Sequence, residues 1–290
     1  MRIVDPYEGV DWSRGVRGNL HCHSLQSDGS APAQQVIAAY AAAGHGFLML
    51  SDHDTLTTAE RYAQWDAHGL VLIPGSEITR DGPHLLRVGG DGEIAPDEDR
   101  QRVIDAIAAA GGLAVMNHPN WFAEHDHCPQ DTLVALRGYA GIEIYNAVIA
   151  ELDGSPYALD RWDRLLSRGR RLWGFANDDA HHLRQVGQGW NVAFPRTRNA
   201  AGVIAALRDG RFYASTGVTI ERIAVADDTL EIVATDAERI IAIGVHSRRL
   251  ATADGDRLRL RVPDGTDFVR FECWGRGERF AWSQPFFIER

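Results

Sequence analysis

The chain has 290 residues and a net charge of −10, with 44% hydrophobic and 24% charged residues. This composition is typical of a globular protein, and the length predicts roughly two domains. All 30 basic residues are arginine, which excludes a P-loop and Schiff-base or pyridoxal-phosphate chemistry, because each of these needs a lysine amine.

Several other classes of protein are disfavoured by the same sequence. The apolar stretches 36–43 and 70–73 are much shorter than the ~20 residues that span a bilayer. The start of the chain, Met1 to Pro6, lacks the apolar core of a signal peptide. Three cysteines cannot form a disulfide framework. We therefore expect a cytoplasmic protein without a membrane partner, and the negative charge argues against a nucleic-acid polymer as partner.

The first two thirds of the chain alternate between strand-like and helix-like segments. The predicted strands are 18–23, 46–52, 71–78, 84–88, 113–117, 142–146 and 172–176. The predicted helices are 33–43, 57–68, 97–110, 156–168 and 200–209. Seven strands with intervening helices predict an α/β fold with a closed or nearly closed barrel.

After Ser215 the pattern changes to short alternating segments. They are 220–225, 230–233, 240–245, 258–262, 268–273 and 286–288, separated by turn residues such as Asp254-Gly255-Asp256. This spacing predicts a small antiparallel, sandwich-like β-domain. We place the boundary between residues 1–215 and 216–290, and because no flexible linker joins them we expect the two parts to pack closely.

Charged and imidazole side chains follow the predicted strands. In His21-Cys22-His23 the two histidines point to one face of a strand, because alternate residues share a face. Ser51-Asp52-His53-Asp54 ends the second strand, where Asp54 could also be a helix cap. Taken alone, each motif is weak evidence for a site.

Taken together, five of the seven predicted strands end in His, Asp or Glu. The later strand ends carry Glu77, His118 and the run Asn177-Asp178-Asp179-Ala180-His181-His182, and His84 opens the strand that follows Glu77. Active sites of α/β barrels lie at the carboxyl ends of the strands. The convergence therefore predicts a metal site at that end.

This set resembles the polymerase and histidinol phosphatase (PHP) family of metal-dependent phosphoesterases. The family's nine ligands match, in order, His21, His23, Asp28, His53, Glu77, His84, His118, Asp179 and His181. The resemblance implies a distorted seven-stranded barrel that holds two to three divalent ions, zinc, manganese or iron. It implies one ion on His21, His23, Glu77 and Asp179, a second on Glu77, His84 and His118, and a third on Asp28, His53 and His181.

The end of the chain carries a further likeness. Residues 207–217 and 281–285 resemble PHP proteins with an appended β-domain, a group that includes carbaryl hydrolases. The implied function is hydrolysis of a small phosphomonoester or phosphodiester by a metal-bridging hydroxide. The alternative is a carboxyl or carbamate ester hydrolase on the same metal site.

Further roles are expected for residues near the ligands. Glu77 and Asp179 are the expected catalytic carboxylates, with Asp52 or His182 as orienting groups. Candidate contacts to substrate oxygens are Asn120, Asn146 and Arg184, and Trp121 is a candidate pocket wall. His125 and His127 are interpreted as part of a solvated loop, in preference to an auxiliary site or lid.

Overall fold

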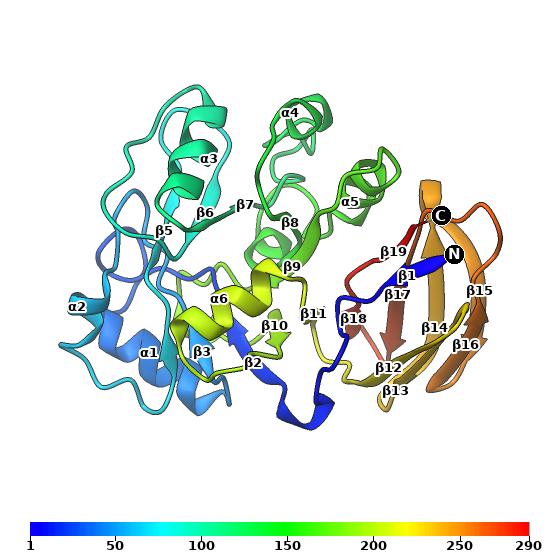
Figure 1. Ribbon diagram of the computed structural model, residues 1–290. Coiled ribbons are helices and arrows are strands. Elements are labelled where there is room, and N and C mark those ends of the chain that lie inside the picture. Colours follow the sequence, from blue (N-terminus) through cyan, green and yellow to red (C-terminus); the bar gives the residue numbers. More distant parts are fainter. Residues whose placement is uncertain (290) are drawn as a thin grey trace.

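The computed structural model describes residues 1–289, and Figure 1 shows an α/β part beside a sandwich of strands. The helices of the α/β part are α1 (Ala33–Ala42), α2 (Ala59–Tyr62), α3 (Arg100–Ala109), α4 (Gln130–Ala135), α5 (Leu159–Leu166) and α6 (Ala200–Arg208). Short 3₁₀ helices are η1 (Trp12–Arg14), η2 (Ala147–Glu151), η3 (Leu183–Gln185) and η4 (Val245–Ser247). The α/β class expected from the sequence is confirmed.

Local sequence explains where the longer helices begin and end. The side chain of Asp99 accepts a hydrogen bond from the Gln101 amide at the start of α3, and Asn199 caps α6 through the Gly202 amide. Gly44 follows α1 with a φ of +79°, a left-handed conformation that glycine adopts without strain. Within residues 1–289, no helix is long and apolar enough to cross a membrane.

The strands of the α/β part lie in two sheets. One contains β5 (Gly75–Ile78), β6 (Leu85–Val88), β7 (Leu113–Met116), β8 (Gly141–Asn146) and β9 (Trp173–Asn177), in that order. The other contains β4 (Val71–Leu72), β3 (Phe47–Leu48), β2 (Val16–Asn19), β10 (Trp190–Ala193) and β11 (Phe212–Ser215). Buried aliphatic and aromatic side chains from both sheets, such as Leu20, Phe47 and Phe175, form a shared core.

A closed seven-stranded barrel is not observed. In the part of the chain that is described, the two sheets are joined by isolated bridges, Cys22 with Ala180 and His53 with Glu77, and by no continuous ladder. The predicted strand 71–78 divides into β4 and β5 around Pro74, which has no amide hydrogen to donate. β6 pairs antiparallel with both β5 and β7, because only a short loop without a helix connects β5 to β6.

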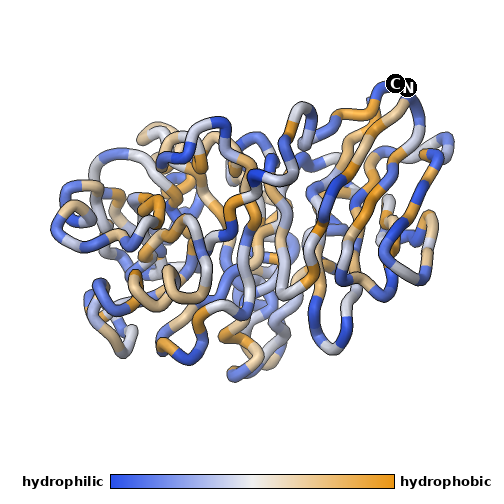
Figure 2. Tube along the Cα trace, turned by 90° about the horizontal axis from the view of Figure 1, so that it is seen from below, coloured by the Kyte–Doolittle hydropathy of each residue, from blue (hydrophilic) through white to orange (hydrophobic). Residues whose placement is uncertain are grey.

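The second sheet continues into the C-terminal strands. β11 pairs with β18 (Phe280–Trp282), and the order then continues through β17 (Phe268–Gly275) and β19 (Phe286–Glu289) to β1 (Arg2–Val4). A branch leaves this path at β17, which also pairs with β14 (Ala237–Gly244). β14 in turn pairs with β15 (Arg248–Asp254). A separate sheet of β12 (Ile220–Ala226), β13 (Thr229–Ala234) and β16 (Arg257–Arg261) covers this region. Because β1 pairs with β19, the two termini lie together in Figures 1 and 2.

The sandwich follows the alternation read from the sequence. Along β16, Leu258 and Leu260 are buried while the arginines on either side are exposed, and Figure 2 shows this mixture of hydrophobic and hydrophilic positions along the strands. The boundary at residues 215 and 216 stays a prediction. Hydrogen bonding runs across it through β11 and β18, and the N-terminal strand pairs with the C-terminal one.

Candidate metal centre

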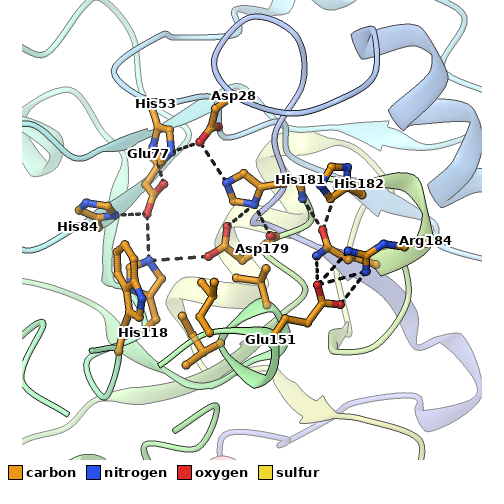
Figure 3. Close-up of a pocket in the computed structure, with 15 residues that line it drawn as sticks. Asp28, His53, Glu77, His84, His118, Glu151, Asp179, His181, His182 and Arg184 are labelled. Carbon is orange, nitrogen blue, oxygen red and sulfur yellow. Dashed lines mark hydrogen bonds and ion pairs between the residues drawn. The ribbon is translucent and has the colours of Figure 1, made fainter. Parts of the chain in front are cut away.

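All nine predicted ligands gather at one end of the two sheets. His21 and His23 follow β2, His53 follows β3, Glu77 lies on β5, His84 precedes β6, His118 follows β7, and Asp179 and His181 follow β9. Asp28 lies in the loop after His23. Most of them line a cavity of about 440 Å³, shown in Figure 3. His21 and His23 do not line it and are fully buried.

Asp179 joins the two histidines that follow β2. Its Oδ1 lies 2.9 Å from His23 Nε2 and 3.2 Å from His21 Nε2. Burial works against ionisation of this carboxyl, but the neighbouring His21 and His23 hold its pKa well below the usual range. The three side chains offer nitrogen and oxygen atoms close enough together to share one ion.

A second group surrounds Asp28 at the mouth of the cavity. Asp28 Oδ2 lies 3.3 Å from His53 Nε2 and 3.3 Å from His181 Nε2. These contacts to His181 and His53 hold the pKa of Asp28 far below its ordinary value. His23 belongs to the same group, so it lies between the first set of ligands and this one.

Glu77 stands at the centre of the cluster. Its Oε1 lies 3.2 Å from His84 Nδ1, 3.3 Å from His21 Nε2 and 3.4 Å from His118 Nε2. Its Oε2 lies 2.9 Å from His53 Nδ1. Burial opposes ionisation, yet the surrounding imidazoles, His21 first, hold the pKa of Glu77 well below the ordinary value. This central position is the one a carboxylate needs to serve two ions.

The donor atoms fit divalent ions better than they fit one another. His21 Nε2, His53 Nδ1, His84 Nδ1 and Glu77 Oε2 are buried without a hydrogen-bond partner among the described residues. A buried polar atom left unsatisfied costs about 1–3 kcal/mol. Imidazole nitrogens and carboxylate oxygens suit zinc, manganese and iron. These atoms lie close together without forming hydrogen bonds, and this arrangement is explained if they bind metal.

Two of the predicted ligands have unusual backbone geometry. His118 has a φ of +23° and Asp179 a φ of +54°, both in the left-handed region that residues with side chains rarely adopt. Strained conformations of this kind persist where surrounding structure fixes them, and they cluster at functional sites. The chain thus turns sharply at the end of β7 and after β9, which directs both side chains into the cluster.

Glu143 is a member of the site that sequence reasoning missed. This buried carboxylate on β8 contacts His21 Nδ1 at 2.7 Å through Oε1, and its Oε2 accepts a hydrogen bond from the His118 amide at 2.9 Å. Asn146 and Asn177 also donate to it, each at 2.8 Å. Burial opposes ionisation, but the nearby His21 lowers the pKa of Glu143. The signal available in the sequence was a single carboxylate, Glu143, within the predicted strand 142–146.

Asp52, expected from the sequence as an orienting group, contacts the loop between His23 and Asp28. Its carboxylate accepts hydrogen bonds from the Ser24 amide, the Ser24 hydroxyl and the Ser27 hydroxyl, at 2.8, 2.9 and 2.8 Å. Asp52 therefore fixes the loop that carries Asp28. A comparable bond joins Asn117 Nδ2 to Glu77 Oε1 at 2.6 Å.

His127 lies against the cluster, whereas His125 is exposed, as the solvated-loop interpretation expects. The His127 ring packs 4.5 Å from the ring of His84 and 4.8 Å from that of His118, and its Nε2 accepts a hydrogen bond from the His84 amide at 2.9 Å. Burial, with the charges of His118 and His84, lowers the pKa of His127 to about 2. The His-x-His motif at 125–127 did not predict whether His127 faces the solvent or the cluster.

The candidate substrate contacts occupy different places. Asn120 bonds to Tyr157, Asp160 and Arg161, and Asn146 donates to Glu143 and Asp179; neither lines the cavity. His182 and Arg184 do line it (Figure 3). Arg184 Nη1 lies 2.8 Å from Glu151 Oε1, so its charge is already paired. Trp121 contributes to the wall, together with Val148, Ile149 and Leu152.

Comparisons with known proteins agree with the resemblance seen in the sequence. Residues 164–212 match the PHP-associated family. The fold is similar to a two-domain protein from Bacteroides vulgatus, described as containing a predicted PHP-like metal-dependent phosphoesterase, with a TM-score of 0.57, 18% identity, and coverage of 99% of this chain and 97% of that one. The PHP resemblance and its two-part architecture are thereby confirmed.

Other solved structures resemble a smaller part of the chain. PsfC from Pseudomonas syringae matches with a TM-score of 0.50 and 15% identity, over 67% of this chain and 89% of that one. The lesion-specific endonuclease PfuEndoQ from Pyrococcus furiosus has a TM-score of 0.49 and 14% identity, over 79% of this chain and 62% of that one. No protein of curated function matches the sequence.

Proposed function

We propose that this chain with a PHP-like fold is a metal-dependent hydrolase, and that it cleaves a small phosphomonoester or phosphodiester. The observation that carries the proposal is the convergence of six imidazoles and three carboxylates, with Glu77 at their centre, at the end of the strands where α/β enzymes place their active sites. A cavity of about 440 Å³ above them suits a small molecule better than a polymer.

The roles of the residues follow from their contacts. Glu77, Asp179, Asp28 and the six histidines would hold two or three divalent ions, of zinc, manganese or iron. Such ions, when bound, lower the pKa of water toward ~7 and stabilise charge on phosphoryl oxygens. Glu143 holds the His21 ring and the His118 backbone in place, and Asp52 fixes the loop of Asp28. Because Glu143 and Asp52 do not line the cavity, the cavity side of the ligands is open to substrate.

Charge recognition supports a phosphate ester. Among the charged side chains that line the cavity and are not predicted ligands, Arg184 and Glu151 neutralise each other. A negative substrate would therefore be attracted by the ions themselves, which are the largest local charges in such a site. Three divalent ions exceed the charge of the three ligand carboxylates, so the centre would be cationic inside an acidic protein.

One observation favours the alternative, a carboxyl or carbamate ester hydrolase on the same site. The apolar part of the cavity wall consists of Trp121, Val148, Ile149 and Leu152, and the Trp121 ring packs against His84 and His118. An apolar wall suits a substrate with an aromatic or aliphatic group beside the bond that is cleaved. Such a group is equally compatible with an aryl phosphate, so the reacting bond must be identified by experiment.

A substrate panel on metal-analysed protein distinguishes the two. We expect turnover of aryl phosphomonoesters or phosphodiesters, competitive inhibition by inorganic phosphate, and loss of activity after chelation that added manganese or zinc restores. Turnover of aryl carboxyl or carbamate esters alone, without inhibition by phosphate, would instead establish the alternative. Protein loaded with metal that cleaves neither class would contradict both.

A further inference from the structure

A second cavity lies at the other end of the strands that lead to the metal centre. Its volume is about 360 Å³, and none of its lining residues lines the first cavity. Arg14 and Arg17 lie where β2 begins and His45 lies just before β3, whereas the ligands His21 and His53 follow the ends of these strands. At about 3.3 Å per residue, Arg17 and His21 are roughly 13 Å apart along the chain.

The charged side chains of this cavity are all basic. They are Arg14, Arg17 and Arg198, and among the described residues no Asp or Glu lines it. This is unusual in a chain with a net charge of −10. A concave surface of one sign concentrates ions of the opposite sign. We name this cavity, with its three arginines and His45, the basic pocket.

Arg17 is held in place but is not neutralised. Its guanidinium stacks 3.5 Å from the centre of the Trp190 ring, and its Nη2 donates to the Gly187 carbonyl at 3.4 Å. Its Nε is buried without a partner. The carboxylate whose charge reaches it, Asp178, accepts hydrogen bonds from three backbone amides and from the Tyr40 hydroxyl instead.

The other two arginines are free to close on a ligand. Arg14 and Arg198 are exposed, and neither forms an ion pair or a side-chain hydrogen bond within residues 1–289. The carboxylate of Asp11, on which the charge of Arg14 acts, has its Oδ1 bonded to Ser13. The end of Arg198 lies close to Gly46, where a Cβ would lie 3.2 Å from Arg198 Nη2 and 2.5 Å from Val16 Cγ1. Glycine at position 46 therefore keeps this side of the pocket open.

His45 supplies an independent sign of a missing partner. It is only 7% exposed, lines the basic pocket, and has no hydrogen-bond partner on either ring nitrogen among the described residues. An unsatisfied buried imidazole is costly, and an oxyanion could accept its N–H. The end of α1 nearby adds little negative charge, because the carbonyls of Ala39, Tyr40 and Ala41 accept bonds from the amides that follow the helix.

We propose that the basic pocket binds a small phosphate-class oxyanion, either inorganic phosphate or the phosphate group of a small molecule, at a site separate from the metal centre. Guanidinium groups present paired N–H donors that match phosphate oxygens, and three of them around one concave site provide both charge and direction. A volume of about 360 Å³ suits a small molecule. The proposal does not depend on which ester the metal centre cleaves.

The test is a calorimetric titration of the metal-loaded full chain with inorganic phosphate, and in a second arm with methylphosphonate, which stands for an esterified phosphate and resists hydrolysis. The variant Arg14→Gln/Arg198→Gln removes two charges from the pocket. Its matched control, Arg259→Gln/Arg276→Gln, removes two exposed arginine charges from the β-domain. Phosphate binding at the metal centre is measured separately, as competitive inhibition of hydrolysis.

We expect the wild type and the control to bind phosphate at a site that the pocket variant loses or binds at least about tenfold more weakly. Inhibition constants at the metal centre should be unchanged in all three proteins. Preference for methylphosphonate over phosphate would indicate an esterified ligand. If the pocket variant binds both probes as the wild type does, or if the control loses binding equally, the basic pocket is not a phosphate site.

Discussion

At the scale of single residues, Glu77 holds the largest number of contacts in the site. Imidazoles from four different segments approach its two oxygens to between 2.9 and 3.4 Å. Each histidine can serve one ion, whereas this carboxylate can bridge two. Its removal should therefore disturb more than one ion at a time.

Glu77→Gln is expected to lower both metal content and turnover by about a hundredfold or more, because the amide keeps the shape but loses the negative charge and one strong donor oxygen. Asp28→Asn, which alters only the group at the cavity mouth, should have a smaller effect. Elemental analysis and hydrolysis assays measure both, and circular dichroism should stay near native. Exposed Glu124→Gln is the matched control. Normal hydrolysis by Glu77→Gln with metal still bound would refute the bridging role.

Glu143 acts through the ligands that it holds, and it touches no open part of the cavity. Glu143→Gln should weaken metal binding about 10- to 100-fold, since the amide cannot accept from His21, the His118 amide and two asparagines at once. A competitive chelator titration measures this loss directly. Excess metal should restore much of the turnover, which distinguishes positioning from a general folding defect. Unchanged metal affinity would contradict the assigned role, and Glu98→Gln serves as the exposed control.

At the scale of elements, the site is formed mainly by polar loops that follow short strands. β3 has only two residues, yet it connects His45 at its start with Asp52 and His53 beyond its end. His45 lies in the turn between α1 and β3, directly before the core residues Phe47 and Leu48, and it is buried with them. This burial makes the stability of the turn sensitive to pH.

Burial, together with the charge of Arg17, lowers the pKa of His45 from 6.5 to about 3. The unfolded chain then binds a proton below pH 6.5 that the folded chain excludes, so the stabilising contribution is complete above pH 6.5 and is lost as the pH falls toward 3. Between pH 6.5 and 5 this contribution should decrease by about 1–2 kcal/mol. Urea unfolding in phosphate-free buffer should show a smaller pH slope for His45→Phe than for the wild type. Exposed His68→Asn should keep the wild-type slope, and equal slopes in all three proteins would contradict the prediction.

At the scale of the whole molecule, the C-terminal sandwich is bonded to the α/β part. Arg270 on β17 is fully buried and contacts both oxygens of Asp163 on α5, at 2.7 and 2.8 Å. Gln284 exchanges two hydrogen bonds with the backbone of Gly174 on β9, each of 2.9 Å. Since β9 leads directly to Asp179, the sandwich supports the strand that carries part of the metal centre.

Removing one partner of the buried ion pair should destabilise the whole chain. Arg270→Met leaves Asp163 buried without its partner, and we expect a loss of about 3–5 kcal/mol in the free energy of unfolding. The double variant Arg270→Met/Asp163→Leu should recover part of this loss, because no unpaired charge at position 163 remains. Denaturant unfolding monitored by tryptophan fluorescence measures all three proteins. Arg239→Met breaks an exposed ion pair and should change little; if Arg270→Met behaves the same way, the interface pair does not stabilise the molecule.

The sequence alone determined the α/β class, the sandwich-like C-terminal part and the identity of the residues that gather in the site. Periodicity predicts strands and helices, and polar residues after apolar runs mark the strand ends. Only the tertiary structure decided which residues support them. Glu143 and His127 reach the cluster through contacts between segments far apart in the chain, and the basic pocket combines residues 14, 17, 45 and 198. The two separate sheets, and the pairing of β1 with β19, are likewise long-range. Local propensity fixes a segment's conformation, but its neighbours are selected by the packing of the entire chain.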